Sequence, residues 1–121
     1  MHVVLADDQE KVRSALFLLS EQGPCFQIVA EAADATGLLR AVSDKAPDLV
    51  LLDWELPGLS ASQLLRLLRY ERPMLQVIAM SSRPEARRES LDAGVQAFVS
   101  KNEPPERLLA LMRDFCKESS S

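Results

Sequence analysis

The stretch Asp48-Leu49-Val50-Leu51-Leu52-Asp53 decides the fold, because an unbroken apolar run of strand length leads directly into an acidic residue. A second run, Val77-Ile78-Ala79-Met80, is also apolar throughout. Strands covered on both faces of a parallel sheet are nearly continuously apolar, whereas half-exposed strands alternate. Both runs are therefore expected at the centre of a parallel sheet.

Outward from these runs, apolar segments of strand length alternate five times with longer segments of helical period, which is typical of an α/β protein. Right-handed connections between parallel strands place such helices on both faces of the sheet. The predicted fold class is a doubly wound α/β protein with five parallel strands, in the order (βα) five times. We expect the strands at His2 to Ala6, Phe26 to Ala32, Asp48 to Leu52, Leu75 to Met80 and Gln96 to Val99.

Apolar residues at helical spacing mark the five helices, and each helix is expected to bury one stripe. The marking residues are Val12, Ala15, Leu16 and Leu19; Leu38, Leu39 and Val42; Leu64, Leu67 and Leu68; the stretch Pro84 to Ala93; and Leu108, Leu111, Met112 and Phe115. The start and stop signals are two capping boxes, Ser60 with Gln63 and Ser82 with Glu85, then Gly94 after the fourth helix and Pro104-Pro105 before the fifth.

The composition fits one globular domain: of 121 residues, 47% are hydrophobic and 26% are charged. The net charge of -4 argues against direct contact with nucleic acid, whose phosphates attract cationic surfaces. No apolar run approaches the roughly 20 residues that span a bilayer, so we expect no membrane contact and a cytoplasmic location. Cys25 and Cys116 lack the spacing of a zinc site or a disulfide framework and are expected as buried or half-buried thiols.

Polar side chains follow four of the expected strands: Asp7-Asp8 the first, Asp53 the third, Ser81 the fourth and Lys101 the fifth. The carboxyl ends of parallel strands meet at one edge, where functional loops gather. Three carboxylates crowded there repel one another unless a cation shares them, and a donor set made only of oxygen suits Mg²⁺, or Mn²⁺ in its place. Mg²⁺ in such a site leaves positions for phosphoryl oxygens, so the sequence predicts a phosphoryl-binding magnesium site.

Each of these residues also has a simpler interpretation. Asp8 is a good cap for the first helix, Asp53 is typical of a turn, and Lys101 is typical of a solvated surface. Ser82 is assigned to a helix cap, which leaves Ser81 at the strand end with a free hydroxyl. The chemical interpretation is favoured because all the groups occupy corresponding strand ends.

Four motifs stand at these strand ends: Ala6-Asp7-Asp8; Asp53-Trp54-Glu55-Leu56-Pro57-Gly58; Met80-Ser81-Ser82; and Ala93-Gly94 followed by Ala97-Phe98-Val99-Ser100-Lys101. In this order, the set resembles the receiver domain of two-component response regulators over essentially the whole chain. Ala6-Asp7-Asp8 and Lys101-Asn102 are most similar to the NarL/FixJ type. The resemblance implies a flavodoxin-like (CheY-like) sheet with strand order 2-1-3-4-5. It also implies a receiver domain over residues 1–118, with 119–121 as a polar tail or the start of a linker.

The resemblance implies a role for each residue of the acidic site. Asp53 would be the phosphoacceptor, which takes a phosphoryl group from a phosphohistidine on a sensor histidine kinase or a phosphotransfer protein. Asp7 and Asp8 would hold Mg²⁺ together with Asp53 and the main-chain carbonyl of Glu55. Such a transfer needs mainly positioning and charge neutralisation, so no additional base is required.

Further residues are assigned to phosphoryl binding and switching. Lys101 would pair with one phosphoryl oxygen, and Ser81 would donate its hydroxyl to another. Phe98 matches the aromatic switch position of the family and would turn inward behind Ser81; alternatively, it is simply part of the core. Glu55 and Arg83 each lie two positions beyond a site residue, and we hypothesise that they pair across the rim and hinder the water that hydrolyses the acyl phosphate.

The predicted function is a signalling switch that alters the surface formed by the fourth helix, fifth strand and fifth helix. Its output would be transcription through a DNA-binding domain outside this sequence, and the fourth and fifth helices are a candidate homodimer surface. The chain is expected to catalyse only its own phosphorylation and dephosphorylation. One departure from the family is Asn102, which stands where receivers commonly have proline after the lysine.

Three other interpretations compete with this one. A phosphatase of the haloacid-dehalogenase type would require an aspartate where Glu55 stands, two residues after the nucleophile. A flavin-binding domain would need hydroxyl or glycine donors in the first loop, which is instead Asp7-Asp8-Gln9-Glu10. The third is a degenerate receiver that keeps the fold but acts as a protein-binding module independent of phosphorylation.

Overall fold

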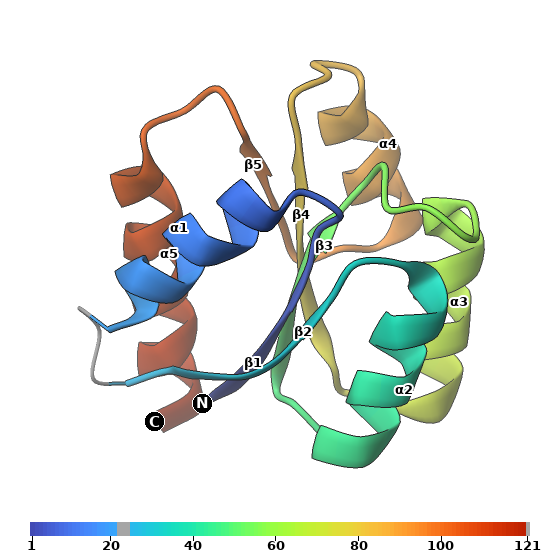
Figure 1. The fold of residues 1–121 in the computed structure, drawn as a ribbon, viewed down its shortest axis with the longest axis horizontal. Helices are drawn as coiled ribbons and strands as arrows, with labels where there is room; N and C mark the ends of the chain where they lie inside the picture. The colour runs from blue at the N-terminus through green and yellow to red at the C-terminus, as the bar shows by residue number, and fades with distance from the viewer. Residues whose placement is uncertain (22–24, 121) are drawn as a thin grey trace.

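Strands and helices alternate along the chain in the computed structural model, which describes residues 1–21 and 25–120 (Figure 1). The strands are β1 (His2–Ala6), β2 (Gln27–Ala32), β3 (Leu49–Asp53), β4 (Gln76–Ser81) and β5 (Ala97–Ser100). The helices are α1 (Glu10–Ser20), α2 (Ala35–Lys45), α3 (Ala61–Glu71), α4 (Ala86–Ala93) and α5 (Pro105–Ser120).

The strands form one parallel sheet in the order β2-β1-β3-β4-β5. Helices α1 and α5 cover one face, and α2, α3 and α4 cover the other (Figure 1). The predicted fold class and strand order are confirmed. Because the strands are parallel, their carboxyl ends lie together at one edge of the sheet, where the polar motifs of the sequence gather.

Side chains of the central strands alternate between two cores. Val50 and Leu52 belong to the core beneath α2, α3 and α4, whereas Leu49 and Leu51 belong to the core beneath α5. All four are at most 1% exposed. This double burial explains why the decisive stretch of sequence is apolar at every position.

The signals for helix ends are confirmed in part. Ser60 and Gln63 form the predicted capping box at α3, Gly94 ends α4 with a φ of 105°, and α5 begins at Pro105. The capping box predicted for Ser82 and Glu85 is wrong. Helix α4 begins only at Ala86, and its N-cap Glu85 makes no side-chain capping bond.

Helix α1 buries its apolar stripe less completely than predicted. Val12, Leu16 and Leu19 are half-buried, and Ala15 is exposed. These residues face a cavity of about 250 Å³ that is also lined by β4, β5 and the start of α5. The stripe therefore packs against the core only in part, through Leu16, and otherwise borders this cavity.

The predicted division between a receiver domain over residues 1–118 and a polar tail or linker over 119–121 stays a prediction. Helix α5 continues to Ser120, and the predicted tail residue Ser121 lies outside the described residues. Cys116 is buried and donates to the carbonyl oxygen of Cys25 at 3.0 Å, whereas Cys25 is exposed, contrary to the prediction. Over residues 1–21 and 25–120, no helix has the length and apolarity needed to cross a membrane.

Candidate functional site

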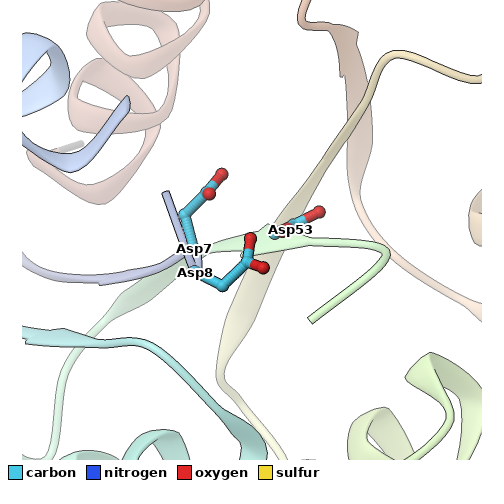
Figure 2. Close-up of side chains that lie close together, drawn as sticks. All are labelled: Asp7, Asp8 and Asp53. Carbon is cyan, nitrogen blue, oxygen red and sulfur yellow. The ribbon is translucent and has the colours of Figure 1, made fainter. Parts of the chain in front are cut away.

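Three carboxylates meet at the carboxyl edge of the sheet (Figure 2). Asp53 is the last residue of β3, and Asp7 and Asp8 directly follow β1. Each offers one oxygen, and these oxygens lie within 4.8 Å of one another. Asp7 and Asp53 are 0% and 2% exposed, whereas Asp8 is exposed, so the cluster is open to solvent on the side of Asp8.

Backbone hydrogen bonds hold the two buried carboxylates in place. Asp7 donates its N–H to Ala32 in β2 at 3.0 Å, and its Oδ1 accepts from the N–H of Gln9 at 2.9 Å. The Oδ1 of Asp53 accepts from the N–H of Glu55 at 3.0 Å. The N-cap of α1 is Gln9 rather than Asp8, so the alternative interpretation of Asp8 as a helix cap is wrong.

Lys101 joins the two buried carboxylates. It follows β5, and its Nζ lies 2.6 Å from Oδ2 of Asp7 and 3.5 Å from Oδ1 of Asp53. Its side chain is 19% exposed, so the interpretation as a solvated surface lysine is wrong. The loop turns without the family's proline: Asn102 donates its N–H to Oγ of Ser100 and its side-chain amide to the carbonyl of Ser82.

The site shifts the pKa values of two of its groups. Burial raises the pKa of the Asp53 carboxyl, and the charges of Asp7 and Glu55 raise it further, against the hydrogen bond from the N–H of Glu55 and the charge of Lys101. Burial alone would lower the pKa of Lys101, but the hydrogen bond to Asp7 and the charges of Asp53 and Asp7 outweigh it and raise that pKa. The site is therefore short of positive charge.

The donor set fits a hard divalent cation. Three carboxylates face one ammonium group, and their oxygens are close enough to share an ion. Carboxylate oxygens are the donors that Mg²⁺ prefers, and one exposed carboxylate among two buried ones leaves room for the waters that Mg²⁺ retains. Asp7, Asp8 and Asp53 could hold such an ion.

The hydroxyl of Ser81 is not free, contrary to the prediction. Ser81 is the buried last residue of β4, and its Oγ donates to Oε1 of Glu55 at 2.6 Å. The same Oγ accepts from the N–H of Arg83 at 3.0 Å. The reason is the missing capping box: the loop after β4 turns on the Ser81 hydroxyl itself instead of on Ser82.

Glu55 and Arg83 pair across the rim as hypothesised, with 3.2 Å between Oε2 and Nε. The sequence analysis did not predict the contacts that Glu89 makes with Arg83 and Trp54. Nη2 of Arg83 lies 3.0 Å from Oε2 of Glu89 on α4, and the same oxygen accepts from the indole N–H of Trp54 at 3.2 Å. Sequence also missed Arg13, which donates to the carbonyl oxygen of Asp7 at 2.7 Å. A single sequence gives no signal for these three contacts, because each depends on the conformation of a loop.

Phe98 lies inside the core. It is 8% exposed and belongs to the apolar cluster beneath α2, α3 and α4. The guanidinium carbon of Arg87 on α4 lies 5.5 Å from the centre of its ring, within the range of a cation–π contact. In this conformation Phe98 is already turned inward, which agrees with the interpretation as a core residue; its switching role stays a prediction.

Known proteins match this chain over nearly its whole length. The transcriptional activator protein ExaE of Pseudomonas putida is 34% identical over 115 residues, which cover 93% of this chain and 54% of ExaE. The phosphate regulon transcriptional regulatory protein PhoB of Klebsiella pneumoniae is 31% identical over 116 residues, which cover 92% of this chain and 49% of PhoB. The chain thus spans about half the length of these relatives.

Solved structures share the fold. A LuxR-family two-component response regulator from Aurantimonas sp. SI85-9A1 superposes with a TM-score of 0.87 at 26% identity, covering 97% of this chain and 85% of that one. NtrX from Brucella abortus superposes with a TM-score of 0.83 at 28% identity, covering 98% of this chain and 28% of that one. A family model described as the response regulator receiver domain matches residues 3–113. Because that match includes most of the chain and all three carboxylates, the chain belongs to the receiver domain family of two-component response regulators.

Proposed function

We propose that the chain is a phosphorylation-dependent switch in which Asp53 accepts a phosphoryl group in the presence of Mg²⁺. The donor would be a phosphohistidine on a sensor histidine kinase or a phosphotransfer protein. One observation carries the proposal: three carboxylate oxygens lie within 4.8 Å of one another, and the Lys101 ammonium contacts two of the three groups. This arrangement supports binding of a cation together with an anionic group that Lys101 can also reach.

Asp53 is the best-placed nucleophile of the three. Both contacts that the described residues make with its carboxylate, from the N–H of Glu55 and from Lys101, fall on Oδ1. Oδ2 is then the oxygen available to attack phosphorus. In the proposed transfer, a bond forms between this oxygen and phosphorus while the bond from phosphorus to the histidine nitrogen breaks.

Charge neutralisation is the main requirement of such a transfer. When bound, Mg²⁺ would offset the carboxylate charge and coordinate phosphoryl oxygens, held by Asp7, Asp8 and Asp53 with the main-chain carbonyl of Glu55. Lys101 would pair with another phosphoryl oxygen. Its ammonium group already lies between Asp7 and Asp53, so only a short movement of the side chain is needed. Ser81 would donate its hydroxyl to a third oxygen once Glu55 releases it.

The pair of Glu55 and Arg83 is proposed to slow hydrolysis of the acyl phosphate. Both side chains project from loops at the carboxyl edge, and their 3.2 Å contact joins the loop after β3 to the loop after β4. A paired carboxylate and guanidinium across this rim would limit the approach of water to phosphorus. The effect is expected to be modest, because the side chains are 40% and 45% exposed.

The proposed output is transcriptional control through a further domain. ExaE and PhoB are regulators of transcription by name, and this chain matches about half of each. The surface of α4, β5 and α5 is the proposed route, because Phe98 in β5 lies beneath Arg87 in α4 and could couple the two. The same surface is proposed for a homodimer.

Fluorescence of Trp54 tests the proposed function, because this residue directly follows Asp53 and is 7% exposed. We expect a saturable response to Mg²⁺ and a further change on addition of acetyl phosphate, which Asp53→Asn abolishes. A protein that responds neither to Mg²⁺ nor to acetyl phosphate would instead be a binding module that works without phosphorylation.

A further inference from the structure

A chain of polar contacts leads from the Ser81 hydroxyl to helix α4. Ser81 Oγ donates to Oε1 of Glu55 at 2.6 Å, and Oε2 of Glu55 lies 3.2 Å from Nε of Arg83. Nη2 of Arg83 lies 3.0 Å from Oε2 of Glu89, which also accepts from the indole N–H of Trp54 at 3.2 Å. Glu89 is thus the point at which this chain is anchored to a helix.

The first contact of the chain conflicts with phosphoryl binding. A serine hydroxyl has one proton to donate. In the structure that proton goes to Glu55, while the lone pairs of Ser81 Oγ accept from the N–H of Arg83. Ser81 therefore cannot donate to a phosphoryl oxygen on Asp53 until its hydrogen bond to Glu55 breaks.

The remaining contacts strengthen the hold of Glu55 on Ser81. Arg83 is 45% exposed and would sample many rotamers if Glu55 were its only partner. Glu89 fixes the other end of the guanidinium, and the indole of Trp54 fixes Glu89 in turn. The hydrogen bond to Glu89 and that to Glu55 both raise the pKa of Arg83, and the hydrogen bond from Arg83 lowers the pKa of Glu89. Arg83 therefore stays charged among three carboxylates, since Oε2 of Glu85 lies 3.7 Å from its Nη1, but its two shorter contacts are those with Glu55 and Glu89.

We propose that Glu89 is a positioning residue: by fixing Arg83 it keeps Glu55 on the Ser81 hydroxyl and so slows delivery of that hydroxyl to a phosphoryl group on Asp53. This inference rests on the proposed phosphoacceptor role of Asp53. Glu89 does not touch the reacting atoms and acts only through Arg83 and Glu55. The conformation of α4 at Glu89 consequently sets how readily the site accepts a phosphoryl group.

The test compares Glu89→Gln with a matched control on the same helix. Glu89→Gln keeps an acceptor for the Trp54 indole but removes the charge that fixes Arg83. Asp92→Asn removes one negative charge from the same helix, at a residue whose partner is Arg88 at 3.8 Å. The rate of phosphorylation by acetyl phosphate with Mg²⁺ is measured for each protein, together with the NMR shifts of the Trp54 indole and the Arg83 Nε–H in the unphosphorylated protein.

We expect Glu89→Gln to be phosphorylated about two- to fivefold faster than wild type, the range that partly exposed ion pairs support. Asp92→Asn should match wild type. Relative to wild type, the resonances of the Trp54 indole and the Arg83 Nε–H should shift in Glu89→Gln but not in Asp92→Asn. A double variant, Glu55→Gln with Glu89→Gln, should be no faster than Glu55→Gln, because Glu89 acts through Glu55.

Two results would overturn the inference while leaving the proposed function intact. One is a wild type that is phosphorylated at the same rate as Glu89→Gln; the other is a double variant whose effects simply multiply. If wild type accepts no phosphoryl group at all, the proposed function fails and the inference fails with it. The three results are distinguished by the rates of the wild type and the variants.

Discussion

Lys101 Nζ lies 2.6 Å from Oδ2 of Asp7, so the ammonium group that follows β5 neutralises a carboxylate with no exposed surface. The contact ties the edge strand β5 to β1 near the middle of the sheet. The same ammonium lies 3.5 Å from Asp53, which places it between a carboxylate of the proposed metal site and the proposed phosphoacceptor. Lys101 thus has a structural role in the unphosphorylated protein besides the role proposed in phosphoryl binding.

Lys101→Met should destabilise the metal-free protein by about 3 kcal/mol, the lower end of the cost of breaking a buried ion pair, because it leaves the buried Asp7 carboxylate without its counter-charge. Mg²⁺ should restore part of this loss, since a bound cation replaces the missing charge. Urea unfolding in EDTA and in Mg²⁺ measures both effects. Lys45→Met, on the exposed surface of α2, is the control. Equal costs for the two variants would contradict the structural role of Lys101.

Asp53→Asn should stabilise the metal-free protein at neutral pH. Burial raises the pKa of Asp53 above its ordinary value of 3.8, so the folded protein holds this proton more tightly than the unfolded chain does. The resulting stability is fully present below pH 3.8 and is lost as the pH rises through the raised pKa. Urea unfolding at several pH values in EDTA should show that the free energy of unfolding of Asp53→Asn, relative to that of wild type, increases as the pH rises. A gain that does not depend on pH would refute this explanation.

Asp8→Asn should weaken Mg²⁺ binding about tenfold or more while changing the free energy of unfolding by less than about 0.5 kcal/mol. Asp8 is the exposed member of the carboxylate cluster, so its loss removes a ligand without leaving a buried group unpaired. Mg²⁺ titration monitored by Trp54 fluorescence gives the affinity, with Asp44→Asn on α2 as the control. Unchanged affinity in Asp8→Asn would exclude this residue from the metal site.

Arg83→Ala should shorten the lifetime of the phosphorylated state about two- to fivefold, because it opens the rim that Arg83 closes with Glu55. The decay is followed after removal of the phosphodonor. Arg88→Ala serves as control, since Arg88 is 91% exposed and pairs with Asp92 on its own helix. An unchanged lifetime in Arg83→Ala would remove the shielding role.

Local sequence signals predicted the strands closely, because they depend on short-range patterns. The strand predicted at His2 to Ala6 is observed with those bounds, and the other four begin one residue later than predicted. The capping box of Ser60 with Gln63 also forms as predicted. Such features follow from the periodicity and the capping chemistry of adjacent residues.

Most contacts between loops were not predictable in the same way, the pairing of Glu55 with Arg83 excepted. Ser82 and Glu85 have capping spacing, but the loop turns on Ser81, whose hydroxyl then reaches Glu55 at 2.6 Å. The anchoring of Arg83 by Glu89 likewise depends on where α4 begins relative to β4. Strand ends bring Asp7, Asp53 and Lys101 together by topology alone, whereas these hydrogen bonds depend on loop conformation, which spacing does not encode.

Mass spectrometry of the intact protein after incubation with acetyl phosphate and Mg²⁺ tests the central claim most directly. The account predicts a mass gain of one phosphoryl group in wild type, mapped to the peptide that contains Asp53, and no gain in EDTA or in Asp53→Asn. The contradicting result is a wild type without any gain, or an Asp53→Asn variant that gains as much as wild type. Either would show that Asp53 is not the phosphoacceptor.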